Sequence, residues 1–358
     1  MSRRGALTIL ACALCALALT PATAGAKKAP KGFFGVVTQE ALTGADYERI
    51  AEGRVKTVRI ALSWASVQQV PGQCQAVEQA GICTWAAMDD IAGRAAQAGA
   101  RILPVLAGSP SFVSKNPKNP PIKGQDAKRW KAFLSAVAER YGRGGRFWGV
   151  FDDYGAKAYP ITDYQIWNEQ NSKQGWQGPP EPRKYAKLLK ISSKAIRKKD
   201  RKADIVLGGM FGDSKVTLTS YMRQLYRVKR VKRYFDTIAL HPYAPQIGDL
   251  KRQLRQARSA ARRGNDRKAK IRITELGWSS KNGSHPLMKG RSGQAKMLKK
   301  AFRLLQKRRG RYNIDGISWF ALQDTDNKAT CKFCLHSGLL ETNNKAKPSW
   351  RAFKKFSK

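Results

Sequence analysis

The sequence predicts an α/β fold, a (β/α)8 TIM barrel that forms a single domain with loop insertions at its C-terminal face. Two observations lead to this prediction. Eight short runs of residues are mostly apolar throughout, as expected of parallel strands that are covered on both faces. Between them lie longer segments whose apolar residues recur at the spacing of an α-helix. Strand followed by helix, repeated eight times, is typical of this barrel, and a doubly wound open sheet is the structural alternative.

Eight expected strands form the wall of the predicted barrel. They are Phe33–Val37, Thr57–Leu62, Arg101–Leu106, Tyr164–Trp167, Ile205–Gly209, Thr237–Leu240, Ile271–Thr274 and Ile317–Phe320. The clearest helical pattern between them has apolar residues at i, i+3, i+4, i+7, i+8 and i+11. Its members are Trp130, Phe133, Leu134, Val137, Ala138 and Tyr141.

Two segments are too long to be simple connections between a strand and a helix. The longest runs from Ala107 to Thr162 and contains a proline-rich stretch, Ser109–Pro121, a helix and a glycine- and aromatic-rich segment, Gly142–Tyr159. The second, Val70–Thr84, contains two cysteines. We expect both to form loops over the mouth of the barrel.

Residues 1–26 resemble a secretory signal peptide, so we expect the folded domain to comprise residues 27–358. Arg3 and Arg4 form a charged start, Ala6–Leu19 is almost wholly apolar, and Ala22-Thr23-Ala24 offers small residues for cleavage. The apolar run is short for a membrane span, and a retained N-terminal anchor is the alternative. The sequence therefore predicts a secreted protein, extracellular or associated with the cell wall, without stable insertion in a membrane.

Cysteine usage agrees with export. Two cysteines leave with the signal peptide, and four remain: Cys74, Cys83, Cys331 and Cys334. An even number in an exported chain indicates disulfides, and four cysteines allow three connectivities. Pairing within each local segment is the simplest of the three. A zinc site is the alternative, but the unequal spacings of the two pairs match a zinc ribbon poorly, and we expect no metal.

The chain is strongly basic. It has 68 Lys and Arg against 25 Asp and Glu, a net charge of +43, of which two charges leave with the signal peptide. The simplest interpretation is a solvated outer face on the barrel helices. The alternative is attraction to an anionic glycan or cell-wall polymer. Nucleic acid is disfavoured, because the basic residues are spread over many helices and no nucleic-acid-binding module is visible.

Two expected strands end in a glutamate. Glu169 follows the strand that contains Tyr164–Trp167, and Glu275 follows Ile271–Thr274. The two glutamates are 106 residues apart, which corresponds to three βα units of about 35 residues. They would then lie on the fourth and seventh strands of one barrel. Two carboxylates that face each other can cleave a glycosidic bond.

Other strand ends carry residues of the kind that binds sugars. Aromatic faces stack on the apolar face of a pyranose ring, while amide, imidazole, phenol and guanidinium groups bond to hydroxyls and orient carboxylates. The candidate substrate-binding residues are Asn168, Arg59, His241, Tyr243, Trp278, Trp319 and Trp64.

At these residues the chain resembles a retaining glycoside hydrolase of clan A, most nearly of the family 39 or family 5 type. Trp167-Asn168-Glu169 is similar to the acid/base motif of the clan, although Gln170-Asn171 follows where many members have Pro-Asn. Residues 273–278 are similar to its nucleophile segment, and residues 240–243 and 318–319 to its sixth and eighth strands. The closing segment, residues 347–353, is similar as well.

The resemblance implies a function and roles for individual residues. It implies hydrolysis of O-glycosidic bonds in a poly- or oligosaccharide, with Glu275 as nucleophile, Glu169 as acid and base, and Asn168 on the 2-hydroxyl. It also implies that Tyr243 contacts the nucleophile. We expect no cofactor and a monomer whose partner is its carbohydrate substrate. A glycan- or cell-wall-binding protein on the same barrel, without turnover, is the alternative.

Overall fold

A computed structural model describes residues 29–72, 74, 82–153, 157–212, 217–328 and 330–358. The expected signal peptide, residues 1–26, lies outside the described residues. Within the described ranges, no helix combines the length and the apolar character that a bilayer crossing requires.

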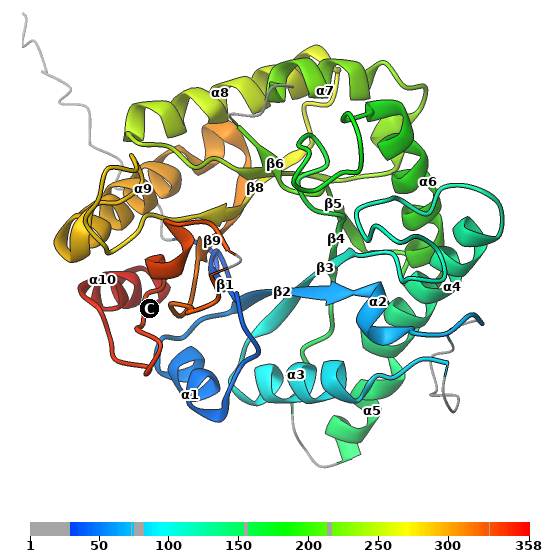
Figure 1. The fold of residues 1–358 in the computed structure, drawn as a ribbon, viewed down its shortest axis with the longest axis horizontal. Helices are drawn as coiled ribbons and strands as arrows, with labels where there is room; N and C mark the ends of the chain where they lie inside the picture. Colours follow the sequence, from blue (N-terminus) through cyan, green and yellow to red (C-terminus); the bar gives the residue numbers. More distant parts are fainter. Residues whose placement is uncertain (1–28, 73, 75–81, 154–156, 213–216, 329) are drawn as a thin grey trace, which may run out of the picture.

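The described strands form one closed parallel sheet, which confirms the predicted barrel. Their order is β5-β4-β3-β2-β1-β9-β8-β7-β6, and a further pairing between β5 and β7 closes the ring. Figure 1 shows the strands around the centre and the helices outside them. The strands are β1 (Phe34–Val37), β2 (Thr57–Ser63), β3 (Arg101–Ala107), β4 (Asp163–Ile166), β5 (Asp204–Val206), β6 (Met210–Phe211), β7 (Thr237–His241), β8 (Lys270–Leu276) and β9 (Ile314–Phe320).

The fifth barrel strand differs from its prediction as one continuous strand, Ile205–Gly209. It is interrupted between β5 and β6, and both pieces pair with β7. Gly209 lies in the interruption with φ +63°, a left-handed conformation that side chains other than glycine seldom adopt. A Cβ on Gly209 would lie 2.1 Å from Nε2 of His241. The interruption therefore makes room for a residue of the barrel interior.

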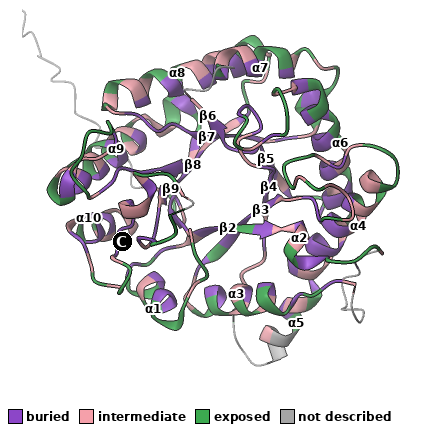
Figure 2. Cartoon of the chain, viewed as in Figure 1, coloured by how far each residue is buried: buried purple, intermediate pink, exposed green. Residues whose placement is uncertain are grey.

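Ten α-helices are described around the barrel. They are α1 (Gly44–Glu52), α2 (Trp64–Val67), α3 (Ala86–Gln97), α4 (Gly124–Tyr141), α5 (Arg146–Asp153), α6 (Pro182–Lys199), α7 (Leu218–Tyr226), α8 (Ile247–Arg263), α9 (Gly290–Tyr312) and α10 (Pro348–Ser357). Their inner faces are buried and their outer faces exposed (Figure 2). All six residues of the predicted pattern in α4 are buried.

The long excursion after β3 contains more regular structure than the sequence indicated. Besides α4, it forms α5 in the segment predicted only as glycine- and aromatic-rich. Phe147 of α5 lies 5.5 Å from the ring of Tyr141, and the indole N–H of Trp148 donates to the Tyr141 carbonyl at 2.8 Å. These contacts attach the inserted helix to the end of α4.

Ion pairs cross the N-terminal end of the barrel. The Arg272 guanidinium contacts Asp163 at 2.7 Å and Asp315 at 2.6 Å, which joins β8 to β4 and β9. A cavity of about 420 Å³ opens beside this cluster. It lies at the opposite end from the C-terminal ends of the strands, where barrel enzymes place their chemistry.

Both locally paired disulfides are present. Cys74 bonds to Cys83 and Cys331 bonds to Cys334, with Cα separations of 5.6 and 5.0 Å. All four cysteines of residues 27–358 are therefore oxidised in pairs, and none remains as a thiolate for the alternative zinc site. The second disulfide adjoins a short 3₁₀ helix, Cys334–His336.

Candidate active site

The two glutamates reach the barrel interior by different local structures. Glu275 lies within β8, whereas Glu169 lies three residues beyond the end of β4. Trp167 and Glu169 both have positive φ, +70° and +47°. The Glu169 N–H donates to the Gly208 carbonyl at 2.5 Å, so the interrupted fifth strand holds this turn. The turn directs the Glu169 side chain toward β7 and β8.

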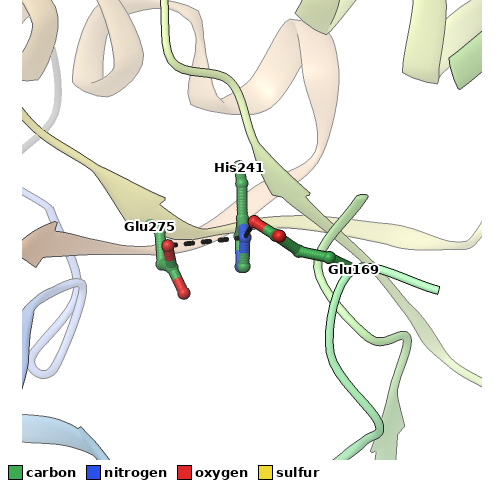
Figure 3. A group of neighbouring side chains, drawn as sticks. All are labelled: Glu169, His241 and Glu275. Carbon is green, nitrogen blue, oxygen red and sulfur yellow. Dashed lines mark hydrogen bonds and ion pairs between the residues drawn. The ribbon is translucent and has the colours of Figure 1, made fainter. Parts of the chain in front are cut away.

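The carboxylates of Glu169 and Glu275 face each other across His241 (Figure 3). His241 Nδ1 lies 2.8 Å from Oε1 of Glu169 and 3.5 Å from Oε2 of Glu275. One oxygen of each carboxylate and one nitrogen of His241 all lie within 4.8 Å of one another. The His241 side chain is fully buried, and those of Glu169 and Glu275 are 18% and 11% exposed.

Arg59 of β2 connects the site across the barrel. Its Nη1 donates to Oε1 of Glu275 at 2.7 Å, and its Nη2 donates to Oδ1 of Asn168 at 2.8 Å. Its Nε donates to Oε1 of Gln165, on β4, at 2.8 Å. All three nitrogens of a side chain that is 4% exposed are therefore engaged in fixing other site residues.

The neighbours of His241 determine its tautomer. Nη2 of Arg59 lies 3.4 Å from Nε2 of His241, and a guanidinium only donates hydrogen bonds. Nε2 is therefore the acceptor, and we assign the ring proton to Nδ1. From there the imidazole donates to Glu169 and fixes the orientation of that carboxylate.

The surroundings of Glu275 favour its ionised form. Burial by itself raises the pKa of the Glu275 carboxyl. The positive charges of His241, when protonated, and Arg59 outweigh burial, together with hydrogen bonds from Tyr243 and Arg59, so the pKa lies below its ordinary value. The Tyr243 hydroxyl donates to Oε2 of Glu275 at 2.8 Å. Burial, followed by the charge of Glu275, raises the pKa of Tyr243 well above its ordinary value, so Tyr243 remains a donor.

Glu169, His241 and Glu275 offer the atoms of a metal-binding cluster. Two features oppose a cation there. Nδ1 of His241 carries the proton that it donates to Glu169, and the Arg59 guanidinium would face the ion as a like charge. The arrangement fits paired carboxylates held by protein donors better than it fits a metal centre.

A cavity of about 530 Å³ adjoins Glu275 at the C-terminal ends of β1, β2 and β3. Glu275, Arg59 and Asn168 reach it from the predicted site. The remaining described lining residues are Val37, Thr38, Gln39, Glu40, Ala61, Ser63, Val105, Ala107, Gly108, Phe320, Thr325, Asn327 and Thr330.

The structure does not bring the three predicted tryptophans to this cavity. Trp64, Trp278 and Trp319 are fully buried. The indole N–H of Trp278 donates to the Ala244 carbonyl at 2.8 Å, and that of Trp319 to the Ser337 carbonyl at 3.0 Å. Trp64 stacks on Phe133 of α4. We correct their interpretation from sugar-binding residues to core residues, because no ring face is open to a ligand.

Two site residues were not found by reading the sequence. Phe320, the neighbour of Trp319 on β9, lines the cavity and precedes a cis peptide bond to Ala321. Successive residues of a strand point to opposite faces, so the alternation of side chains along β9 could have identified Phe320 in place of Trp319. Gln165 is fully buried and bonds Arg59. A lone polar residue inside an apolar strand was the available signal.

Comparison with known proteins agrees with the geometry. Residues 160–350 match the family model described as the glycosyl hydrolase catalytic core. This range is more than half of the chain and includes both glutamates. A search of curated protein sequences finds no match.

Several solved structures share the fold. One is a family 39 glycoside hydrolase from the gut symbiont Bacteroides cellulosilyticus WH2, with TM-score 0.64 and 16% identity over 91% of this chain and 63% of that chain. Another is a monomeric β-xylosidase from Caulobacter crescentus CB15, with TM-score 0.65 and 14% identity over 92% and 69%. A third is an intracellular xylanase from Thermoanaerobacterium saccharolyticum JW/SL-YS485, with TM-score 0.59 and 16% identity over 91% and 95%.

The chain spans less than two thirds of the length of the Bacteroides protein, so the two share a barrel but not their whole extent. At these identities the structural likeness shows the fold alone. The family follows from the match to its model over residues 160–350. The chain belongs to the glycosyl hydrolase catalytic core family.

Proposed function

We propose that this protein hydrolyses O-glycosidic bonds in a poly- or oligosaccharide with retention of anomeric configuration. The observation that carries the proposal is the approach of the Glu169 and Glu275 carboxylate oxygens to within 4.8 Å. Retaining enzymes hold their two carboxyl groups about 5–5.5 Å apart, whereas inverting enzymes leave about 6.5–9.5 Å for a water molecule. The short separation supports attack by a carboxylate rather than by water in the first step.

The different surroundings of the glutamates support different roles. Glu275 is the nucleophile, because Arg59 and Tyr243 bond its two oxygens and its pKa lies below the ordinary value. Glu169 is the acid and base. His241 bonds Oε1 of Glu169, so the other oxygen is left to carry the proton that reaches the leaving group. Asn168, held by Arg59, lines the cavity and is placed to bond a sugar hydroxyl.

The reaction proceeds in two displacements. Glu275 attacks the anomeric carbon, the bond to the leaving oxygen breaks, and Glu169 gives its proton to that oxygen. Water then attacks the same carbon, gives a proton to Glu169 and releases Glu275. The carboxylate and the proton donor are both restored, so no cofactor takes part in the balance.

The test compares Glu275→Gln with Glu169→Gln on two aryl glycosides that differ in their leaving group. Glu275→Gln should abolish turnover of both substrates. Glu169→Gln should lose turnover of the phenyl glycoside but keep rapid first-step release of dinitrophenolate, which needs no proton. NMR should show the first product in the starting anomeric configuration. Glycan binding without turnover in the unaltered protein would instead support the alternative, a glycan-binding barrel.

We further propose that the protein is exported, with residues 1–26 as its signal peptide, and that it acts on or near an anionic glycan or cell-wall polymer. The two disulfides are consistent with an oxidising compartment. The net charge, +43 for the whole chain and +41 without residues 1–26, would attract a polyanion over long range. Raising salt from 0.1 to 1 M shortens the Debye length from about 10 Å to about 3 Å. The KM for an acidic polymer should then rise while kcat changes little, and an unchanged KM would contradict capture by charge.

A further inference from the structure

The cavity beside Glu275 differs in charge from the rest of the molecule, and this difference bears on the substrate. Resting on the proposed function, we propose that the sugar unit bound in this cavity is neutral and that Glu40 discriminates against acidic sugars there. The basic exterior would then attract an acidic polymer, while the cavity would accept only its neutral sugar units. The acidic units would lie outside the cavity during cleavage.

The first argument is the lack of an available cation. Among the described residues that line the cavity, Arg59 is the only basic one. Its three nitrogens already bond Gln165, Glu275 and Asn168, and its side chain is 4% exposed. A sugar carboxylate in the cavity would therefore find no unengaged guanidinium or ammonium among the described lining residues. Burying a charge without a partner is unfavourable.

The second argument is the presence of carboxylates. Glu40 and Glu275 both line the cavity, and Glu169 follows Asn168 in the chain. Two carboxylates in the wall thus face one guanidinium that is already engaged. A carboxylate at C6 of a bound pyranose would meet like charges within a few ångströms, where water screens them incompletely.

The third argument is that Glu40 is held in place. Its Oε1 accepts a hydrogen bond from the Thr325 hydroxyl. The neighbouring Gln39 donates to the Cys334 carbonyl at 3.2 Å and accepts from the Thr330 hydroxyl at 3.5 Å. The disulfide-closed segment therefore supports the wall that carries Glu40. Glu40 is exposed, so its carboxylate remains accessible to a ligand in the cavity.

The experiment uses pairs of 4-nitrophenyl glycosides that differ only at C6, where one member has a hydroxymethyl group and the other a carboxylate. Both anomeric series are tested. The salt concentration is high, which suppresses attraction to the basic surface. For every pair that is hydrolysed, kcat/KM should favour the neutral member by at least about 30-fold, which corresponds to about 2 kcal/mol. Glu40→Lys should reduce that ratio by at least about tenfold, or about 1.4 kcal/mol. Glu48→Lys, the same charge change at an exposed position of α1, should leave the ratio unchanged.

Equal or greater turnover of the acidic member would overturn the inference while leaving the proposed function intact. So would a ratio that shifts equally in both lysine variants. If no pair is hydrolysed, that arm counts against the proposed function, and binding decides the inference. Saturation-transfer NMR at high salt should then detect neutral monosaccharides, and Asn168→Ala should weaken their signals. The inference would be overturned if glucuronate bound more strongly than the neutral monosaccharides and its binding also depended on Asn168. It would also be overturned if neither neutral nor acidic monosaccharides bound.

Discussion

Replacement of Tyr243 by phenylalanine removes one atom from the site and tests the role of Glu275 most directly. The hydroxyl donates to Oε2 of Glu275 at 2.8 Å, and the tyrosine ring packs against Phe320 at 6.0 Å and Phe333 at 5.3 Å. Phenylalanine keeps these ring contacts and loses only the hydrogen bond. The substitution should therefore change the charge balance at Glu275 without emptying space in the core.

The expected size follows from the bond that is lost. A hydrogen bond to a charged group contributes about 1.5–3 kcal/mol, and one pKa unit corresponds to about 1.36 kcal/mol. The Tyr243 hydrogen bond is one of the interactions that lower the pKa of Glu275, so its loss raises that pKa. The nucleophile must be ionised, so activity is lost as pH falls through this pKa. In Tyr243→Phe the acid limb of the pH profile should move to higher pH. At a pH on that limb, the loss of about 1.5 kcal/mol or more should lower kcat/KM by about tenfold or more.

The assay is kcat/KM for an aryl glycoside measured from pH 3 to 8 in the unaltered protein and in Tyr243→Phe. Tyr221→Phe is the matched control, because the Tyr221 hydroxyl is buried and has no hydrogen-bond partner among the described residues. It should reproduce the unaltered profile. An acid limb that stays in place in Tyr243→Phe, with both variants folded, would refute the assignment of Glu275 as the ionised nucleophile.

Three further changes have defined expectations. Gly209→Ala places a Cβ 2.1 Å from Nε2 of His241, on a left-handed backbone, and should lower kcat by about 100-fold or more while circular dichroism stays similar. Normal activity would show that His241 can move freely. Arg272→Met leaves two partly buried carboxylates without the guanidinium that pairs with them. It should reduce the free energy of unfolding in urea by about 3–5 kcal/mol, and a loss below about 1 kcal/mol would contradict this expectation. The double substitution Cys331→Ser and Cys334→Ser opens a short loop. It should reduce the free energy of unfolding by about 2 kcal/mol and raise KM. Unchanged values of both would show that this disulfide stabilises neither the fold nor the cavity wall.

The barrel was predictable because its signals are redundant along the chain. Continuous apolar strands alternate with helices of period 3.6, and a single misplaced boundary does not alter that order. The fifth strand is the exception, because it was predicted as continuous and is interrupted in the structure. Gly208 and Gly209 were included in it because they continue an apolar run, yet the positive φ of Gly209 and the hydrogen bond from Glu169 to Gly208 depend on contacts with distant segments. Local sequence cannot report those contacts.

Among the predicted site residues, the polar and charged ones lie in the site and the tryptophans do not. Arg59, Asn168, His241, Tyr243 and the two glutamates were selected by residue type at strand ends, and they form one connected hydrogen-bond network in the structure. The three tryptophans were selected by the same criterion and lie in the core. Charge and hydrogen-bonding groups are costly to bury without partners, so they indicate function more reliably than aromatic rings, which a core accepts as readily as a sugar site does.

The charge of the whole surface and the charge of the cavity are two different properties, and composition alone does not distinguish them. A net charge of +43 describes the whole chain, and it suggested an anionic partner as the alternative to a solvated basic exterior. The cavity that adjoins Glu275 contains one described guanidinium, which is fully engaged, and the additional carboxylate of Glu40. Long-range attraction depends on the sum of charges over the surface, whereas recognition at the scissile bond depends on the few groups within hydrogen-bond reach. The polymer that this protein approaches and the sugar unit that it cleaves therefore need not share a charge, and the two must be tested with different substrates.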